Sequence, residues 1–246
     1  MPLTLPSPSQ AALLLDVDGT LLDFAPTPES VIVPPGLIDT LHRLRTALGD
    51  ALAVVSGRPI EQVDALLHSA PYAVAGEHGG ALRRQPGAPI ERPDLPTLPA
   101  DWLPAADAIA ASHPGARVER KQRGFVLHYR QAPDSGPALR QAALALIAPR
   151  ADQFQLLEAA LAWEIRPLGM DKGLAVATLM AHPPFAGRLP IYIGDDITDE
   201  DAIRAAQAAG GAGMLVAPIF GTPAGVRSWL ATAAEALAAG RAFPPP

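Results

Sequence analysis

Two aspartates separated by one residue are the first side chains in this sequence that could do chemistry. Asp16 and Asp18 lie in the segment DVDGT, directly after the apolar run 11–15. In such a pair one carboxylate can attack an electrophile while the other transfers a proton. If the electrophile is phosphorus, Asp16 would form an aspartyl-phosphate, and Asp18 would protonate the leaving alkoxide and then deprotonate water. A simple Asp-Gly turn has the same letters, so DVDGT alone leaves both interpretations open.

Two hydroxyls and a lysine fit the same phosphoryl chemistry. The side chains of Thr20 and Ser56 could bind phosphoryl oxygens. Lys172 is one of only two lysines in the chain, and a flexible point charge can neutralise a phosphate. It is predicted in the first turn of a helix, where the helix dipole disfavours a cation. A bound anion or a neighbouring carboxylate would remove this conflict; a solvent-exposed lysine is the alternative.

The segment GDDITDED, residues 194–201, concentrates acidic side chains with no basic residue among them. Such a cluster is costly unless it is solvated, caps a helix or is neutralised by a cation. Asp195 is the strongest candidate for a metal ligand, and Asp199 could reach the same cation directly or through water. Capping of the next helix by Thr198 or Asp199 is the alternative, and the two uses are compatible.

The elements that must position these side chains alternate between strand and helix. Apolar runs predict buried strands at 11–15, 51–55, 72–76, 190–194 and 214–217. Helices are predicted at 36–48, 60–68, 171–182, from about 198, and at 223–239. This order predicts an α/β fold with a doubly wound, parallel-sheet (Rossmann-like) core.

Ligands of such sheets bind at the carboxyl ends of the strands. The polar residues expected at those ends are Asp16, Asp18, Ser56, Glu77, His78, Asp195 and Asp196. Carboxylates gathered at one edge favour a hard, oxygen-seeking cation such as Mg²⁺.

The middle of the chain has a different pattern. A proline-rich stretch from residue 84 precedes a helix at about 104–112, and a hairpin follows with strands at 116–121 and 124–130 and its turn at Gln122 to Gly124. The remaining elements of this part are a helix at 136–148 and strands near 153–158 and 162–166. We therefore expect a core made of residues 1–83 and 166–246, with an α+β domain inserted at 84–165.

Composition excludes several classes of protein. With 246 residues, 49% of them apolar, the chain can bury a core, which excludes wholesale disorder. No apolar run approaches the ~20 residues of a membrane span, and the N-terminal segment lacks the features of a secretory signal. A net charge of −6 argues against nucleic-acid binding, and the absence of cysteine excludes thiolate chemistry. We expect a cytoplasmic monomer with no nucleic-acid or membrane partner.

The four segments DxDGT, SGR, DKG and GDDxTDE, in this order, resemble the haloacid-dehalogenase-type phosphatase superfamily. The GDDxTDE form, the GEHG run at 76–79 and the inserted domain together resemble trehalose-6-phosphate phosphatases. The resemblance covers both flanks of the chain. It implies that the inserted domain is a cap, and that the activity is Mg²⁺-dependent hydrolysis of the sugar phosphate trehalose 6-phosphate.

The resemblance also implies residue roles. Asp16 would be the nucleophile and Asp18 the general acid/base, while Ser56 and Lys172 would hold the transferring phosphoryl group. The implied Mg²⁺ ligands are the Asp16 carboxylate, the Asp18 backbone carbonyl and Asp195, with Asp199 close by. Residues expected to bind substrate are Thr20, Gly57, Arg58, Glu77, His78, Glu119, Lys121 and Glu164.

The last three match a VExK segment and a WEIRP segment, and their carboxylates can accept bidentate hydrogen bonds from sugar hydroxyls. The alternatives are a solvated basic hairpin for residues 117–130 and a structural role for His78.

Three other functions are compatible with parts of the pattern. The same chemistry could act on sucrose 6-phosphate, a phosphohexose or a glucosyl-phosphoglycerate, because the catalytic residues contact only the phosphate and the metal, not the sugar. A phosphomutase would return the phosphoryl group to the sugar instead of giving it to water. A phospho-acceptor signalling domain also combines carboxylates, a hydroxyl and a lysine, but it has no use for a proton-transferring Asp18 or for an inserted domain.

Overall fold

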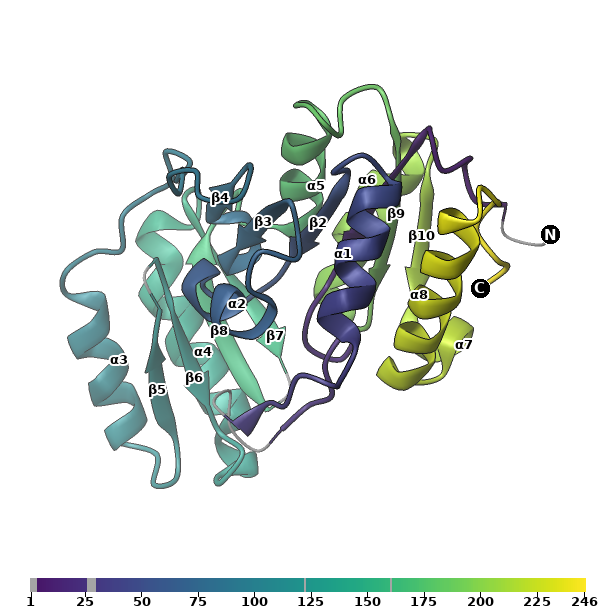
Figure 1. Ribbon diagram of the computed structural model, residues 1–246. Helices are drawn as coiled ribbons and strands as arrows, with labels where there is room; N and C mark the ends of the chain where they lie inside the picture. The colour runs from purple at the N-terminus through teal and green to yellow at the C-terminus, as the bar shows by residue number, and fades with distance from the viewer. Residues whose placement is uncertain (1–3, 26–29, 122, 160) are drawn as a thin grey trace. The chain divides into compact units, whose positions relative to one another are not determined.

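The computed structural model describes residues 4–25, 30–121, 123–159 and 161–246. Gln122 in the predicted hairpin turn and the first three residues of the N-terminal segment therefore lie outside the described residues. The chain divides into two compact units, one made of Met1–Pro93 and Asp171–Pro246 and the other of Asp94–Met170 (Figure 1). Each unit has its own sheet and its own cluster of buried apolar side chains.

The first unit is built on a six-stranded sheet with the order β10-β9-β1-β2-β3-β4. Its strands are β1 (Ala11–Leu15), β2 (Leu52–Val55), β3 (Ala73–Gly76), β4 (Ala81–Arg83), β9 (Leu189–Gly194) and β10 (Ala212–Leu215). Neighbouring strands run parallel except β4, which pairs antiparallel with β3. β1, β2 and β3 are buried along their whole length, which accounts for their uninterrupted apolar sequences. The predicted parallel α/β core is confirmed; the antiparallel edge strand β4 was not predicted.

Helices cover both faces of this sheet. They are α1 (Leu37–Ala47), α2 (Ile60–Leu67), α5 (Lys172–Met180), α6 (Glu200–Ala208), α7 (Val216–Phe220) and α8 (Pro223–Ala238). α1 packs beside α8, and α5 packs beside α6; Figure 1 shows the two pairs on opposite faces. The predicted strand at 214–217 was wrong in its second half, because Val216 and Ala217 begin α7. A run of four apolar residues does not distinguish the end of a strand from the start of a buried helix.

The second unit is an antiparallel four-stranded sheet with helices on one face. Its elements are α3 (Trp102–Ala111), β5 (Arg117–Arg120), β6 (Phe125–His128), α4 (Gly136–Ile147), β7 (Phe154–Ala159) and β8 (Ala162–Pro167), with the strand order β5-β6-β8-β7. Phe125, Leu127 and Ile165 point to the helices and are buried there with Trp102. Because side chains alternate along a strand, Glu119 and Glu164, which pair in register with Val126, share the opposite face.

Within the described part of the chain, no helix combines the length and the apolar character needed to cross a membrane.

Candidate active site

The turn after β1 and the end of β9 bring two aspartates together. Asp16 follows β1, Asp195 follows β9, and these strands are parallel neighbours in the sheet. Gly19 allows the close approach: its φ is +77°, and a Cβ atom at this position would overlap the carboxylate of Asp195. Only glycine adopts this backbone conformation without strain. The glycine of DVDGT therefore makes the turn and leaves room for the second carboxylate.

Lys172 lies between two buried carboxylates. Its side chain is 4% exposed, and Nζ donates to Oδ1 of Asp16 and to Oδ1 of Asp199, both at 2.7 Å. It is the first residue of α5, whose N-cap is Asp171; the Asp171 carboxylate accepts from the backbone N–H of Leu174 at 2.7 Å. The two carboxylates supply the negative charge that a lysine at the start of a helix needs.

Burial governs the ionisation of this group of residues. It raises the pKa of the Asp16 carboxyl well above its usual value, against the opposing charge of Lys172 and with a further increase from Asp199. Burial alone would lower the pKa of Lys172, but Asp16 and Asp199 together raise it above its ordinary value, so the lysine is charged. Burial, followed by repulsion from Asp196 and Asp199, raises the pKa of Asp195 to about 6.

Asp199 is fully buried and accepts four hydrogen bonds. Its Oδ1 accepts from Lys172 and from the hydroxyl of Tyr192, the latter at 2.5 Å. Its Oδ2 accepts from the backbone N–H groups of Asp195 at 3.1 Å and Asp196 at 3.2 Å. The predicted capping of the next helix by Thr198 or Asp199 was wrong in its residue. Asp196 caps the short turn that precedes α6 by accepting from the backbone N–H of Thr198, and the side chain of Asp199, the residue before α6, makes no capping hydrogen bond to that helix.

Sequence reasoning missed Tyr192. It is the only hydroxyl in the apolar run PIYIG, and a buried tyrosine usually finds a hydrogen-bond partner for its OH. Burial, reinforced by the Asp199 carboxylate, raises the pKa of Tyr192 well above its usual value, so its OH stays protonated and donates. A single hydroxyl in an otherwise apolar strand was therefore the sequence feature from which this hydrogen bond could have been predicted.

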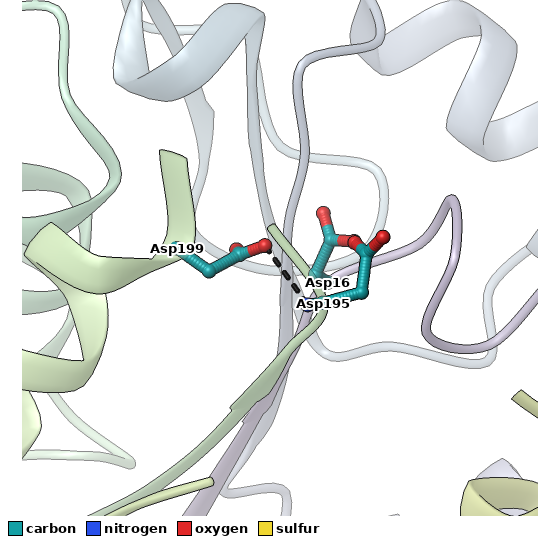
Figure 2. Close-up of side chains that lie close together, drawn as sticks. All are labelled: Asp16, Asp195 and Asp199. Carbon is teal, nitrogen blue, oxygen red and sulfur yellow. Dashed lines mark hydrogen bonds between the residues drawn. The ribbon is translucent and has the colours of Figure 1, made fainter. Parts of the chain in front are cut away.

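Three carboxylates of this site could share a cation. One oxygen from each of Asp16, Asp195 and Asp199 lies within 4.8 Å of the others. Figure 2 shows the carboxylates of Asp16 and Asp195 side by side, with Asp199 hydrogen-bonded to the Asp195 backbone. Two of the three side chains are buried and Asp195 is partly exposed. Carboxylate oxygens are the ligands that Mg²⁺ prefers in proteins.

The Asp18 carboxylate is held by an arginine from another turn. Arg58 Nε donates to Oδ2 at 2.6 Å and Nη2 donates to Oδ1 at 2.7 Å. The backbone N–H of Arg58 donates to Oγ of Ser56 at 3.1 Å. Ser56 and Thr20 are buried, and the Thr20 hydroxyl has no hydrogen-bond partner among the residues that the structure describes.

The turns after β2 and β3 pack against each other. A Cβ atom on Gly57 would lie 2.7 Å from ring atoms of His78, so glycine lets the two turns approach. Glu77 and His78 both have positive φ, 54° and 53°, which residues with a side chain rarely adopt. The Glu77 carboxylate pairs with Arg92 at 2.8 Å, a partner that the sequence did not reveal.

The second unit brings together the three residues expected to bind the sugar. Lys121 Nζ donates to Oε1 of Glu164 at 3.4 Å. Glu119 is hydrogen-bonded to His128 on the neighbouring strand, with 2.7 Å between Oε2 and Nε2. This hydrogen bond to His128 holds the pKa of Glu119 below its usual value, although partial burial opposes it. The pairing with His128 was not predicted.

Comparison with known proteins places the chain in a family. The family model described as Trehalose-phosphatase matches residues 14–225. The chain belongs to this family. A probable trehalose-phosphate phosphatase of Sinorhizobium fredii is 40% identical over 211 residues, which cover 84% of this chain and 78% of the relative. The trehalose-6-phosphate phosphatase of Escherichia coli is 36% identical over 222 residues, covering 89% and 80% of the two chains.

The fold agrees with this assignment. The C-terminal domain of trehalose-6-phosphate phosphatase from C. albicans superposes with a TM-score of 0.74 at 20% identity, covering 92% of this chain and 93% of that one. The predicted architecture, a doubly wound α/β core with an inserted α+β unit, is therefore confirmed.

Proposed function

We propose that the chain is a Mg²⁺-dependent phosphatase that hydrolyses trehalose 6-phosphate to trehalose and phosphate through an aspartyl-phosphate on Asp16. One observation carries the proposal: Asp16, buried at the end of β1, is held by Lys172 and lies beside Asp195 in a chain of the trehalose-phosphatase family. We propose trehalose 6-phosphate as the substrate because both relatives reported above are named for trehalose phosphate.

The reaction has two halves that use the same two aspartates. In the first, an oxygen of Asp16 bonds to phosphorus as the bond from phosphorus to the sugar oxygen breaks, and Asp18 gives its proton to that oxygen. In the second, Asp18 takes a proton from water as the water oxygen bonds to phosphorus and the bond from Asp16 breaks. Trehalose leaves in the first half and phosphate in the second.

The other residues of the core hold charge in place. Lys172 neutralises the charge on the transferring phosphoryl oxygens and fixes the orientation of the Asp16 carboxylate toward phosphorus. The hydroxyls of Ser56 and Thr20 bind phosphoryl oxygens; the unpartnered Thr20 hydroxyl supports this role. When bound, Mg²⁺ favours the ionised form of Asp16 and disperses the negative charge on phosphorus.

We assign the Mg²⁺ contacts to Asp16, the Asp18 carbonyl and Asp195. Because the oxygens of Asp199 already accept four hydrogen bonds, we assign it the task of positioning Lys172 and the Asp195 backbone rather than a direct metal contact.

The inserted segment, expected over 84–165, is assigned to sugar recognition. Glu119, Lys121 and Glu164 offer two carboxylates and a cation on one sheet face. Carboxylates accept hydrogen bonds from sugar hydroxyls, and the ammonium group donates to sugar oxygens. Glu77 and His78, which follow β3, keep their predicted role in binding substrate.

Lys121→Ala is expected to lower kcat/KM for trehalose 6-phosphate at least ~10-fold. The kcat/KM for p-nitrophenyl phosphate is expected to change less than ~3-fold, because this aryl ester has no sugar to recognise. Steady-state kinetics on both esters measure this. Arg120→Ala is the matched control, since Arg120 is the neighbouring residue and an exposed cation, which pairs with Asp107. Equal losses on both esters would show that Lys121 does not select the sugar.

Affinity for Mg²⁺ is expected to fall ~10-fold for each pH unit below about 6. The pKa of Asp195 is raised to about 6 by burial and by Asp196 and Asp199, and a protonated carboxyl is a poor ligand. Calorimetric titration with Mg²⁺ at pH 5 and pH 7.5 measures this, and Asp195→Asn should bind weakly at both. Asp201→Asn, an exposed neighbour paired with Arg204, should behave like the parent chain. Equal affinity of the parent chain at both pH values would contradict the assignment.

Phosphate release from a panel of esters with Mg²⁺ tests the function itself. The panel contains trehalose 6-phosphate, sucrose 6-phosphate, a phosphohexose and a glucosyl-phosphoglycerate. The expected result is many turnovers, fastest on trehalose 6-phosphate. A faster reaction on another ester would mean that this ester, not trehalose 6-phosphate, is the substrate. A stable phospho-protein without turnover would refute the phosphatase activity. The cytoplasmic location and the monomeric state stay predictions from the sequence.

A further inference from the structure

Arg58 grips the carboxylate of Asp18 with two hydrogen bonds. Nε and Oδ2 are 2.6 Å apart, and Nη2 and Oδ1 are 2.7 Å apart. Both side chains are largely shielded from water, with 11% of Arg58 and 28% of Asp18 exposed. Two parallel N–H···O bonds from a planar guanidinium fix the plane of a carboxylate, which a single contact does not do.

The arginine is itself held in place. Its backbone N–H donates to Oγ of Ser56 at 3.1 Å, and its carbonyl accepts from the backbone N–H of Glu77 at 3.0 Å. At the other end of the side chain, Nη1 donates to Oε1 of Gln62 at 3.4 Å. The guanidinium is therefore anchored both through the turn after β2 and through α2.

We propose that Arg58 is a positioning residue, which orients the carboxyl group of Asp18 for both proton transfers. The inference rests on the proposed function, since it needs Asp18 as the acid and base. A carboxylate has about four lone-pair directions. The two N–H groups of the Arg58 guanidinium occupy two of them and thereby fix the directions of the other two. The resemblance implied that Arg58 binds substrate, but its guanidinium lies on Asp18, 40 positions earlier in the chain.

Two esters with different leaving groups test this role. Trehalose 6-phosphate must receive a proton from Asp18 as its alkoxide leaves, whereas 2,4-dinitrophenolate leaves without one. Both esters need Asp18 to activate water in the second half. With Mg²⁺ present, Arg58→Ala is expected to lower kcat for trehalose 6-phosphate ~10²-fold and to leave KM within ~3-fold. With 2,4-dinitrophenyl phosphate, the variant is expected to release one equivalent of phenolate per site within ~3-fold of the parent rate, followed by a slow steady state.

A double-mutant cycle tests whether Arg58 acts through Asp18. If it does, Arg58→Ala added to Asp18→Asn should change the remaining activity less than ~3-fold, because the group that it positions is already gone. Arg58→Lys keeps the charge without the fork and is expected to fall between the parent and Arg58→Ala. Thermal unfolding of each variant shows whether it is folded. If Arg58→Ala does not fold, Arg58→Lys takes its place in every comparison.

Three results would overturn the inference. One is a rise in KM on both esters with kcat unchanged, which would make Arg58 a substrate-binding residue. Another is an equal loss in the first turnover of both esters. The third is full additivity with Asp18→Asn. If the parent chain hydrolyses neither ester with Mg²⁺, the proposed function fails instead, so the two failures are distinguishable.

Discussion

Asp16→Asn is expected to lose at least ~10⁴-fold in kcat on every phosphate ester while it folds like the parent chain. The amide oxygen is a poor nucleophile. No other carboxylate takes its place, because Asp199 is held by Lys172 and Tyr192 and Asp195 is assigned to Mg²⁺. The substitution also removes the buried carboxyl group of Asp16. Burial raises the pKa of this group, which means that its charged form is costly in the folded chain. We therefore expect the free energy of unfolding to stay within ~1 kcal/mol of the parent value or to increase.

Phosphate release and denaturant unfolding measure the two halves of this prediction. Acid quenching of the parent chain during turnover should trap a phospho-protein, and the variant should yield none. Asp39→Asn, an exposed carboxylate on α1, is the control for the change of charge and should retain activity. An active Asp16→Asn would rule out the covalent step.

Lys172→Met is expected to lose ~10³-fold or more in kcat and ~3–5 kcal/mol of stability in the absence of metal. The lysine is 4% exposed and is the cation that Asp16 and Asp199 share. Without it, the buried carboxylates of Asp16 and Asp199 lose the cation that they share, and Asp199 keeps only its three uncharged donors. The cost of a buried charge that loses its partner is large. Added Mg²⁺ should restore part of the stability, because it binds only the folded chain.

The stability loss of Lys172→Met should also depend on pH. Burial raises the pKa of Asp16 in the folded chain above its value in the unfolded chain, and loss of the lysine removes the opposing charge. A raised pKa stabilises the fold at low pH, and that contribution is lost as the pH rises through the folded-state value. The variant should therefore be closer to the parent at pH 5 than at pH 8.

Denaturant unfolding at the two pH values measures this, with Lys121→Met as the matched control. Lys121 is the other lysine of the chain, is 33% exposed and pairs with Glu164 at 3.4 Å. The Lys121 ammonium group is partly exposed, although the Glu164 side chain is only 11% exposed. This control should therefore lose less stability than Lys172→Met. Similar losses for the two variants, or no dependence on pH for Lys172→Met, would refute the charge argument.

Much of the fold was predictable because its signals are local. Buried parallel strands need uninterrupted apolar runs, so β1, β2, β3 and β9 were visible in the sequence. The edge strand β4 has three residues, too short for a periodic pattern. The short helix α7 was hidden in the same way by an apolar run that it shares with the end of β10.

The sequence by itself determined which chemistry this protein could carry. Asp16 and Asp195 each follow an apolar strand, and parallel strands bring such positions to one edge of the sheet, whatever the details of packing. The motif order was enough to point to the family. Only the tertiary structure decided which groups pair there: Lys172 with Asp16, 156 positions away, Tyr192 with Asp199, and Arg58 with Asp18. These pairings depend on turn geometry and side-chain rotamers, which bring together residues far apart in the chain and which no local pattern records.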